Sequence, residues 1–372
     1  MEIEGRVPGR PGLWALSCDG NRITRVACAD PAFAETRCSW ITPGLFDLQI
    51  NGIAGTHFTS PALTSEDLGH ADELIRGKGI SRYCPTLITS SRATSLAALG
   101  AFRAAWEADV VPGAWGIHLE GPWISPEDGY RGVHQLRFIR DPDGEELEAM
   151  QERSGGRVRV LTLAPELPGA MDLIRRAARL GITVSLGHTN ADAGQIGHAV
   201  RAGARMSTHL FNGAARLLDR HRNVIFSQLS EDSLFACFIA DGHHVPFPTL
   251  QTGLRAKGPS KSILVSDLAP VAGLPDGDYD MEGNRVELRE GGVWVKESWQ
   301  LSGAARTLDE DVALLSRQEE PGIEQALLMA TRNPAAAVGE PEWAELSPGR
   351  RGPIAVFFWD GTRLSLETRE GF

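Results

Sequence analysis

The chain has 372 residues, of which 42% are hydrophobic and 23% charged, a balance that excludes a disordered, collagen-like or coiled-coil protein. Its 48 acidic and 37 basic residues give a formal net charge of −11, which excludes a non-specific binder of nucleic acid or acidic membranes. Taken alone, this charge also argues against an anionic substrate. The length suits two or three domains, or one α/β barrel with an appendage.

The cysteines and the first residues indicate in which cellular compartment the protein is expected. The five cysteines are an odd number and form no C-x-x-C pair, which argues against a disulfide framework or a cysteine zinc site and fits a reducing compartment. The first residues lack the apolar segment of a signal peptide, and no apolar run reaches the roughly 18 residues that a membrane span needs. We expect a cytoplasmic protein without a membrane or nucleic-acid partner.

Both ends of the chain carry a predicted β-hairpin. Each hairpin has two strand-like runs around an Asp-Gly pair: residues 13–18 and 21–28 around 19–20, and residues 354–359 and 363–368 around 360–361. We expect these pieces to form one small β-sandwich domain from both termini. The predicted domains are therefore residues 1–43 plus 341–372, and a central domain of residues 44–340.

The central domain alternates between apolar runs and helix-length stretches. The eight runs are residues 45–50, 80–86, 114–120, 158–164, 182–188, 204–209, 235–241 and 262–267, and the clearest helical stretches are 66–78, 92–108, 143–153, 171–180 and 191–202. Apolar strands that alternate with helices indicate a parallel sheet, and eight such units predict a (β/α)8 barrel. A doubly wound open sheet lacks support, because no G-x-G-x-x-G follows the first run.

The alternation of apolar runs and helical stretches is interrupted after the eighth run. Residues 270–300 contain several Gly-punctuated strand-like runs, and they predict a β-hairpin excursion from the barrel. Residues 309–316 and 322–332 then predict two closing helices.

Polar residues end the eight apolar runs, and barrel enzymes build their sites at that face. In chain order these residues are Asp47 with Gln49, Thr86, Glu120, Glu166, His188, His209, Asp241 and Asp267. The set of Glu120, His188 and His209, on three different runs, is typical of a hydrolytic zinc site with an open position for water. Asp267 could take a proton from that water and return it to the leaving group.

A structural interpretation stands beside the catalytic one. A single histidine at a strand end commonly makes structural hydrogen bonds, so the spacing alone leaves a metallohydrolase and a structural role both open. We expect His118, on the same strand face as Glu120, to pack or to support a ligand. We expect Glu166 and Asp241 to orient loops. Four further histidines fall in loops or helices and are expected at the surface: His57, His70, His198 and His221.

Ordered motifs between about residues 43 and 339 carry a family resemblance. They are 43–52 (PGLFDLQING), 118–123 (HLEGPW), 132–134 (GVH), 163–166 (LAPE), 187–191 (GHTNA), 208–212 (THLFN), 240–245 (ADGHHV), 264–267 (LVSD), 301–303 (LSG) and 330–334 (ATRNP). At these residues the chain resembles the N-acetylglucosamine-6-phosphate deacetylases of the metal-dependent amidohydrolase superfamily. The resemblance implies a (β/α)8 barrel with a small β domain and a homodimer.

The resemblance also implies catalytic roles. Glu120, His188 and His209 would hold one divalent metal ion per subunit, for which zinc is favoured and iron, manganese or cobalt are acceptable. Asp267 would act as the general base and acid. His134 would lie beside the amide carbonyl of the substrate and stabilise the developing oxyanion.

The implied substrate contacts are fewer. Asn212 and Gly121 would touch the N-acetyl amino sugar phosphate, and His244 would contact its phosphate. Arg220 would reach the phosphate from a neighbouring subunit, since arginine suits bidentate phosphate recognition. With Arg222 and His243 near Arg220 and His244, a small basic pocket could exist on an acidic surface, so the net charge no longer excludes an anionic substrate.

Two departures from the family pattern matter. Asp47-Leu48-Gln49 replaces the His-x-His that holds a second metal in many metal amidohydrolases, so one metal is expected. Residues 220–223 read Arg-His-Arg-Asn, where the family tends to have Arg-Glu-Pro-Gly, which leaves the phosphate preference open. The alternatives are a deacetylase of a different or non-phosphorylated N-acetyl amino sugar, and a non-catalytic sugar-binding barrel.

Overall fold

An eight-stranded sheet forms the centre of the molecule. The structure is a computed structural model that describes residues 2–29, 38–281, 283–318 and 320–371. The sheet order is β14-β13-β12-β11-β10-β9-β8-β5, and neighbouring strands run parallel. The strands are β5 (Leu45–Ile50), β8 (Ile80–Ile88), β9 (Ile117–Glu120), β10 (Val158–Leu163), β11 (Thr183–Leu186), β12 (Ala204–Ser207), β13 (Phe235–Phe238) and β14 (Ser262–Leu264). All eight lie within two or three residues of the predicted runs.

The sheet closes between its first and last strands. The chain that follows β14 returns beside β5, where Ile50 and Leu268 form a parallel bridge. The Asn51 amide donates to the Leu268 carbonyl at 2.8 Å, and the Asp267 amide donates to the Gln49 carbonyl at 3.0 Å. These bonds complete the ring and confirm the predicted barrel.

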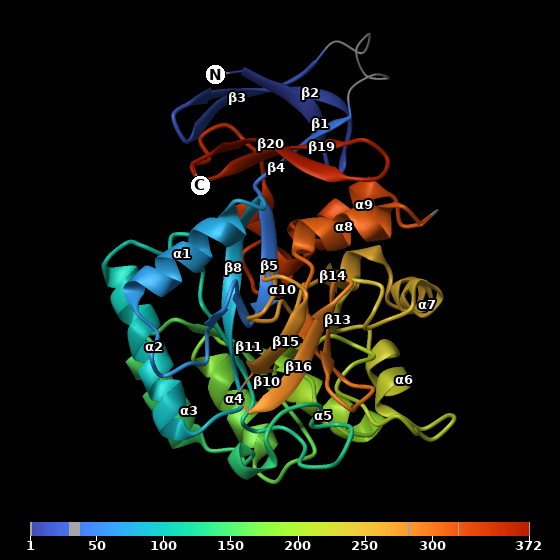
Figure 1. Ribbon diagram of the computed structural model, residues 1–372. Coiled ribbons are helices and arrows are strands. Elements are labelled where there is room, and N and C mark those ends of the chain that lie inside the picture. The colour runs from blue at the N-terminus through green and yellow to red at the C-terminus, as the bar shows by residue number, and fades with distance from the viewer. Residues whose placement is uncertain (1, 30–37, 282, 319, 372) are drawn as a thin grey trace.

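One α-helix follows each barrel strand and covers its outer face (Figure 1). These helices are α1 (Ser65–Arg76), α2 (Arg92–Glu107), α3 (Gly144–Arg153), α4 (Ala170–Arg179), α5 (Ala193–Ala202), α6 (Val224–Leu229), α7 (Phe247–Lys257) and α8 (Leu308–Ser316). α1 shows why they form: Thr64 and Asp67 make a capping box, and Leu68, Ala71 and Ile75 recur at helical spacing on the buried face.

The predicted closing helix at residues 322–332 is split in the structure. α9 spans Ile323–Met329 and α10 spans Arg332–Ala337. Pro334 explains the break, because it cannot donate an amide hydrogen to the carbonyl four residues earlier, while it fits the first turn of a new helix. The residues that the structure describes also contain three short 3₁₀ turns: η2 (Leu136–Phe138), η3 (Pro259–Lys261) and η4 (Pro341–Ala344).

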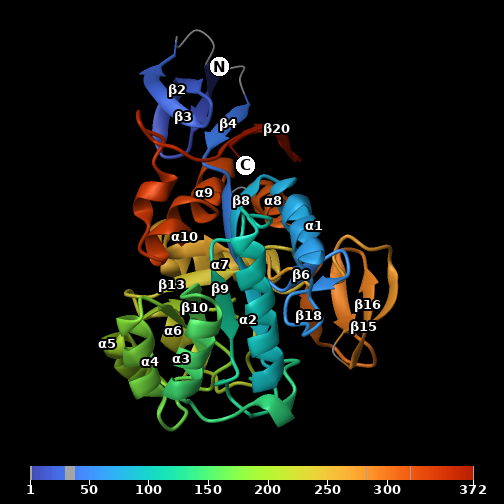
Figure 2. The same cartoon turned by 90° about the vertical axis from the view of Figure 1, so that its left-hand side faces the viewer.

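The predicted excursion after β14 is a four-stranded antiparallel sheet, here called the flap (residues 277–304). Its strands are β15 (Gly277–Met281), β16 (Asn284–Arg289), β17 (Gly292–Val295) and β18 (Leu301–Ala304). Figure 2 shows the flap standing beside the barrel. A two-stranded hairpin, β6 (Gly52–Ile53) and β7 (Thr56–His57), follows the first barrel strand.

Both termini enter one six-stranded sheet, as predicted. Its order is β20-β19-β4-β1-β2-β3, and its strands are β1 (Glu2–Val7), β2 (Arg10–Asp19), β3 (Arg22–Cys28), β4 (Ser39–Thr42), β19 (Ile354–Trp359) and β20 (Leu364–Glu370). Two halves of this sheet meet at one bridge, Arg6 to Trp40, and enclose an apolar cluster that includes Leu16, Ile23 and Ile354. They form two layers at the amino-terminal end of the barrel strands (Figure 1). Residues 30–37 of the predicted small domain lie outside the described residues.

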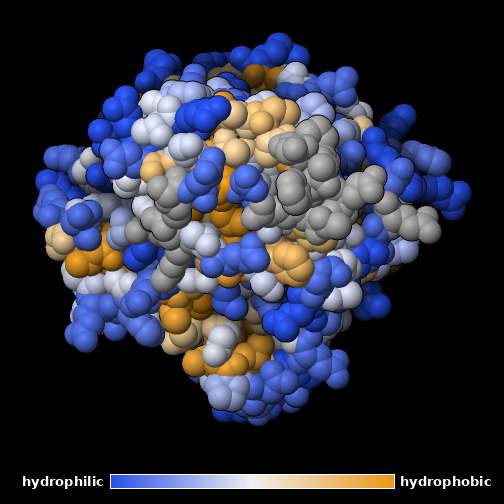
Figure 3. Space-filling view, turned by 90° about the horizontal axis from the view of Figure 1, so that it is seen from above, coloured by the Kyte–Doolittle hydropathy of each residue, from blue (hydrophilic) through white to orange (hydrophobic). Residues whose placement is uncertain are grey.

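The surface over the terminal sheet is mostly hydrophilic. Seen from above, its hydrophobic side chains form small separate groups among polar ones (Figure 3). Among the described residues, no helix has the length and apolar character needed to cross a membrane.

Candidate active site

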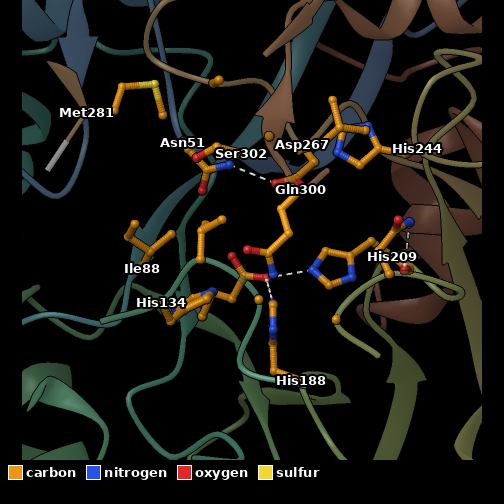
Figure 4. A pocket seen from close by; sticks show the side chains of 18 of the residues that line it. Asn51, Ile88, His134, His188, His209, His244, Asp267, Met281, Gln300 and Ser302 are labelled. Carbon is orange, nitrogen blue, oxygen red and sulfur yellow. Dashed lines mark hydrogen bonds and ion pairs between the residues drawn. The ribbon is translucent and has the colours of Figure 1, made fainter. Parts of the chain in front are cut away.

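A cavity of about 270 Å³ lies at the carboxyl ends of the barrel strands. Seven of the predicted site residues line it: Glu120, His134, His188, His209, Asn212, His244 and Asp267 (Figure 4). Gly121 and Arg220 do not line it. These residues come from six segments of the chain, and Glu120 and Asp267 are 147 positions apart. The barrel fold brings them together.

The backbone places the central side chains in an unusual way. Glu120 ends β9, His188 and His209 lie two residues beyond β11 and β12, and Asp267 lies three beyond β14. The φ angles of His188, His209 and Asp267 are +50°, +26° and +52°. Residues other than glycine rarely adopt this left-handed region, and such strain clusters at functional sites.

One carboxylate oxygen is the centre of the cluster. Glu120 Oε1 lies 3.1 Å from His188 Nε2 and 2.9 Å from His209 Nε2. His188 Nδ1 lies 2.9 Å from the Tyr130 carbonyl, to which it donates. A neutral ring protonated at Nδ1 presents its Nε2 lone pair toward Glu120, and a proton or a cation must then separate the two electron-rich atoms.

The donor set fits a divalent metal. Within the described ranges, Glu120, His134 and His188 offer ligand atoms that all lie within 4.8 Å of one another. His209 extends this group, because its Nε2 approaches the same Glu120 oxygen. The buried Nδ1 atoms of His134 and His209 have no hydrogen-bond partner among the described residues. Imidazoles and one carboxylate with a cavity in front of them are the ligands of a hydrolytic metal site.

The electrostatics of the cluster follow from burial and from its opposite charges. Burial would raise the pKa of Glu120, but hydrogen bonds and charges from His188 and His209 hold that pKa well below its usual range. Burial would lower the pKa of His209, but Glu120 raises it. Burial and the nearby His188 lower the pKa of His134 to about 3, so this ring is neutral at pH 7.

Asp267 faces the cluster across the cavity. Its Oδ1 accepts hydrogen bonds from Asn51 Nδ2 at 2.7 Å and from Gln49 Nε2 at 2.9 Å (Figure 4 shows the first). Gln49 Nε2 also lies 3.0 Å from Glu120 Oε1, so one amide group bridges the two carboxylates. Burial and then the charge of Glu120 raise the pKa of Asp267.

His118 has the supporting role that its position predicted. Its Nδ1 lies 2.9 Å from the Leu48 carbonyl and its Nε2 lies 2.7 Å from Thr162 Oγ1. Both ring nitrogens are therefore engaged with other residues, and neither is available to a ligand in the cavity.

Glu166 and Asp241 orient loops, as expected. Glu166 accepts hydrogen bonds from the Thr189 hydroxyl and, at 2.7 Å, from the Asn190 amide. Asp241 accepts from the His244 backbone amide at 2.9 Å and from His244 Nδ1 at 2.7 Å. The second pair fixes the tautomer of His244, which lines the cavity.

The expectation that His57 lies at the surface is wrong. The β6–β7 hairpin folds back over the barrel mouth, so His57 lines the cavity, and burial lowers its pKa to about 4. A two-residue strand leaves too short a pattern for the sequence to predict. The other three histidines, His70, His198 and His221, are exposed, as predicted.

Two predicted substrate residues lie outside the cavity lining. Gly121 has a φ of +81°, and a Cβ there would lie 2.1 Å from Thr89 Oγ1, so the backbone requires glycine. Arg220 is exposed on the loop after Asn212.

Sequence reasoning missed the outer wall of the cavity. The flap supplies Met281, Trp294, Trp299 and Gln300 to it. The sequence predicted only strand-like runs in this segment, and whether they reach the cavity depends on how the flap packs beside the barrel. Gln49 and Asn51 were inside a recognised motif, but their bonds to Asp267 depend on barrel closure.

The chain is similar to known proteins over most of its length, although no family model matches it. It is 35% identical to the N-acetylglucosamine-6-phosphate deacetylase of Bos taurus, over 80% of this chain and 74% of that one. It is 30% identical to the N-acetylgalactosamine-6-phosphate deacetylase of Shewanella sp., over 87% and 80%.

A solved structure agrees with these relatives. The D267A mutant of N-acetyl-D-glucosamine-6-phosphate deacetylase from Mycobacterium smegmatis, in complex with N-acetyl-D-glucosamine-6-phosphate, matches with a TM-score of 0.84 and 27% identity, over 95% of this chain and 92% of that one. The chain belongs to the N-acetylglucosamine-6-phosphate deacetylase family.

Proposed function

We propose that the protein hydrolyses the acetamide of N-acetylglucosamine 6-phosphate to glucosamine 6-phosphate and acetate. One observation supports this proposal above all. In a chain of this family, a single cavity holds a set of metal-ligand side chains together with a buried carboxylate, Asp267. Net charge does not oppose this substrate, because binding depends on the local groups.

We assign the metal to Glu120, His188 and His209. The two Nε2 atoms that approach Glu120 Oε1 support this choice over one with His134, which comes from a loop. When bound, a divalent ion lowers the pKa of a water molecule and polarises a carbonyl oxygen. Zinc fits the nitrogen and oxygen donors, and iron, manganese or cobalt would fit them too.

Asp267 moves the proton in this mechanism. It accepts a proton from the attacking water and delivers it to the amine nitrogen as the C–N bond breaks. Asn51 and Gln49 both donate hydrogen bonds to Oδ1 of Asp267. We therefore assign the proton to the other carboxylate oxygen, Oδ2. Its raised pKa suits it to both directions of transfer.

His134 stabilises the oxyanion that forms on the acetamide carbonyl. Because burial keeps its ring neutral at pH 7, it donates a hydrogen bond without adding a full charge to the metal cluster. Its buried Nδ1 has no partner among the described residues, which leaves this atom available to the substrate.

The sugar phosphate is assigned to His244 and Asn212. Both residues line the cavity, and Asp241 holds the ring of His244. Gly121 would contribute through its backbone beside Glu120. Arg220 is exposed and does not line the cavity of its own chain, which supports our proposal that it reaches the phosphate of a neighbouring subunit in a homodimer.

Two further proposals concern the whole chain. We propose a cytoplasmic location, which the odd number of cysteines and the absence of a C-x-x-C pair support. We also propose that residues 1–43 plus 341–372 form one domain and residues 44–340 the other.

The test is a matched assay of acetate release. Metal-loaded enzyme is given N-acetylglucosamine 6-phosphate, N-acetylgalactosamine 6-phosphate and free N-acetylglucosamine. We expect the highest kcat/KM for the first. A higher value for the second would favour the activity named for the Shewanella relative, and equal use of the free sugar would contradict the phosphate assignment. If none of the three releases acetate, the protein would be a non-catalytic sugar-binding barrel.

A further inference from the structure

The cavity lacks a strong cation for an anionic substrate. The described residues that line it include two acids, Glu120 and Asp267, and several histidines, but no arginine or lysine. A phosphate monoester carries about two negative charges at pH 7, and arginine is the side chain best suited to bind it. The described lining of one chain therefore supplies no guanidinium of its own to the phosphate, in addition to the Arg220 proposed from a neighbouring subunit.

Arg216 lies at the edge of the cavity. Its guanidinium carbon is 5.5 Å from the ring centroid of Trp299, which lines the cavity from the flap and is 55% exposed. Arg216 also follows Asn212, another lining residue, by four positions. The stack thus joins the loop after β12 to the flap across the outer side of the cavity.

The charge of Arg216 is not neutralised. It forms no ion pair with a carboxylate in residues 2–29, 38–281, 283–318 and 320–371. A cation–π contact with an aromatic face uses none of the N–H donors of a guanidinium for a hydrogen bond. Those donors remain available to phosphate oxygens.

A second stack in the flap provides the contrast. Arg289 lies 5.2 Å from the ring centroid of Trp294, which also lines the cavity. Its Nε, however, makes a 3.1 Å ion pair with Glu287. The two arginines therefore share a cation–π contact with a tryptophan of the flap and differ in whether a carboxylate pairs with the guanidinium.

We propose that Arg216, positioned by Trp299, is a phosphate-binding residue supplied by the same chain that supplies the metal ligands. The inference rests on the proposed function, since it takes a sugar 6-phosphate as the ligand. Arg216 would thus be a second cation for the phosphate besides Arg220, and it would act without a second subunit.

The experiment measures the binding of glucosamine 6-phosphate by calorimetry to the metal-loaded wild type and to R216Q, R216K and R289Q. We expect R216Q to raise the Kd about tenfold or more, because it removes a charge-assisted hydrogen bond. R216K should recover part of the loss, and R289Q should stay within about twofold of wild type. A thermal melt checks that each variant is folded.

Turnover separates this inference from the proposed function. R216Q should lower kcat/KM for N-acetylglucosamine 6-phosphate and leave that for N-acetylglucosamine unchanged. A Kd for R216Q within twofold of wild type, or an equal loss with both substrates, would overturn the role of Arg216. A wild type that binds glucosamine 6-phosphate through Arg216 but releases no acetate would support the inference and defeat the proposed function.

Discussion

The inner and outer walls of the cavity differ in the elements that form them and in their exposure to solvent. The inner wall consists of strand ends, and its residues Glu120 and His209 are only 3% exposed. The outer wall consists of the flap and the loop after β12, where Trp299 is 55% exposed. Reacting groups need a dry, rigid setting, whereas the groups that admit a substrate must be reachable from solvent. We therefore expect changes in the inner wall to abolish chemistry and changes in the outer wall to alter binding.

The largest expected effect is on the metal. His209→Ala removes one of the proposed ligands, so metal affinity should fall by about 100-fold or more and turnover should be lost. Metal content after gel filtration measures the first effect, and acetate release measures the second. The exposed His198→Ala is the matched control and should retain both. If the His209→Ala variant keeps its full metal content, His209 is not a ligand and His134 would be the third ligand instead.

The next effect separates proton transfer from binding. Asp267→Asn cannot accept the proton, so kcat should fall by about 10³-fold while metal content and the Kd for glucosamine 6-phosphate stay unchanged. Steady-state kinetics and calorimetry measure the two quantities. Asp172→Asn, on the exposed face of α4, is the control. Retention of more than a tenth of wild-type kcat would contradict the role of Asp267.

A third prediction concerns stability rather than activity. Asp311 in α8 is fully buried, and neither of its carboxylate oxygens has a partner among the described residues. Burial raises its pKa well above the usual value, so the folded state holds a proton that the unfolded state loses above about pH 4. Wild-type stability should therefore decline as the pH rises through this window.

Asp311→Asn removes that decline. At pH 7 the variant should gain about 1–3 kcal/mol in the free energy of unfolding, and at pH 4 the gain should vanish. Urea unfolding at both pH values measures it, with Asp172→Asn again as the control. An equal gain at both pH values would mean that protonation of Asp311 is not the cause.

The smallest effect is expected in the outer wall. Trp294→Leu removes an aromatic surface of the cavity, so KM should rise about two- to tenfold while kcat is kept. Steady-state kinetics with the phosphorylated substrate measure both, and Trp14→Leu in the terminal sheet is the control. A larger loss in kcat than in KM would remove the distinction between the two walls.

Much of the inner wall was predictable from local sequence. Continuous apolar runs marked the eight strands, because strands buried on both faces need them. The polar residue after each run then marked one face of the barrel. The outer wall was not predictable to the same degree, because Trp294 lies on a half-exposed strand and Gln300 lies between two strands. Only the packing of the flap beside the barrel brings both residues to the cavity.

The sequence by itself determined the barrel, its terminal sheet and the residues at the strand ends, since hydrophobic periodicity and turn residues act over a few positions. Only the tertiary structure decided which of those residues meet. Closure through Ile50 and Leu268 joins Gln49 to both Glu120 and Asp267, residues 71 and 218 positions away. The same folding brings His57 into the cavity and engages both nitrogens of His118 elsewhere. Such contacts depend on register and packing between distant segments, which no local pattern records.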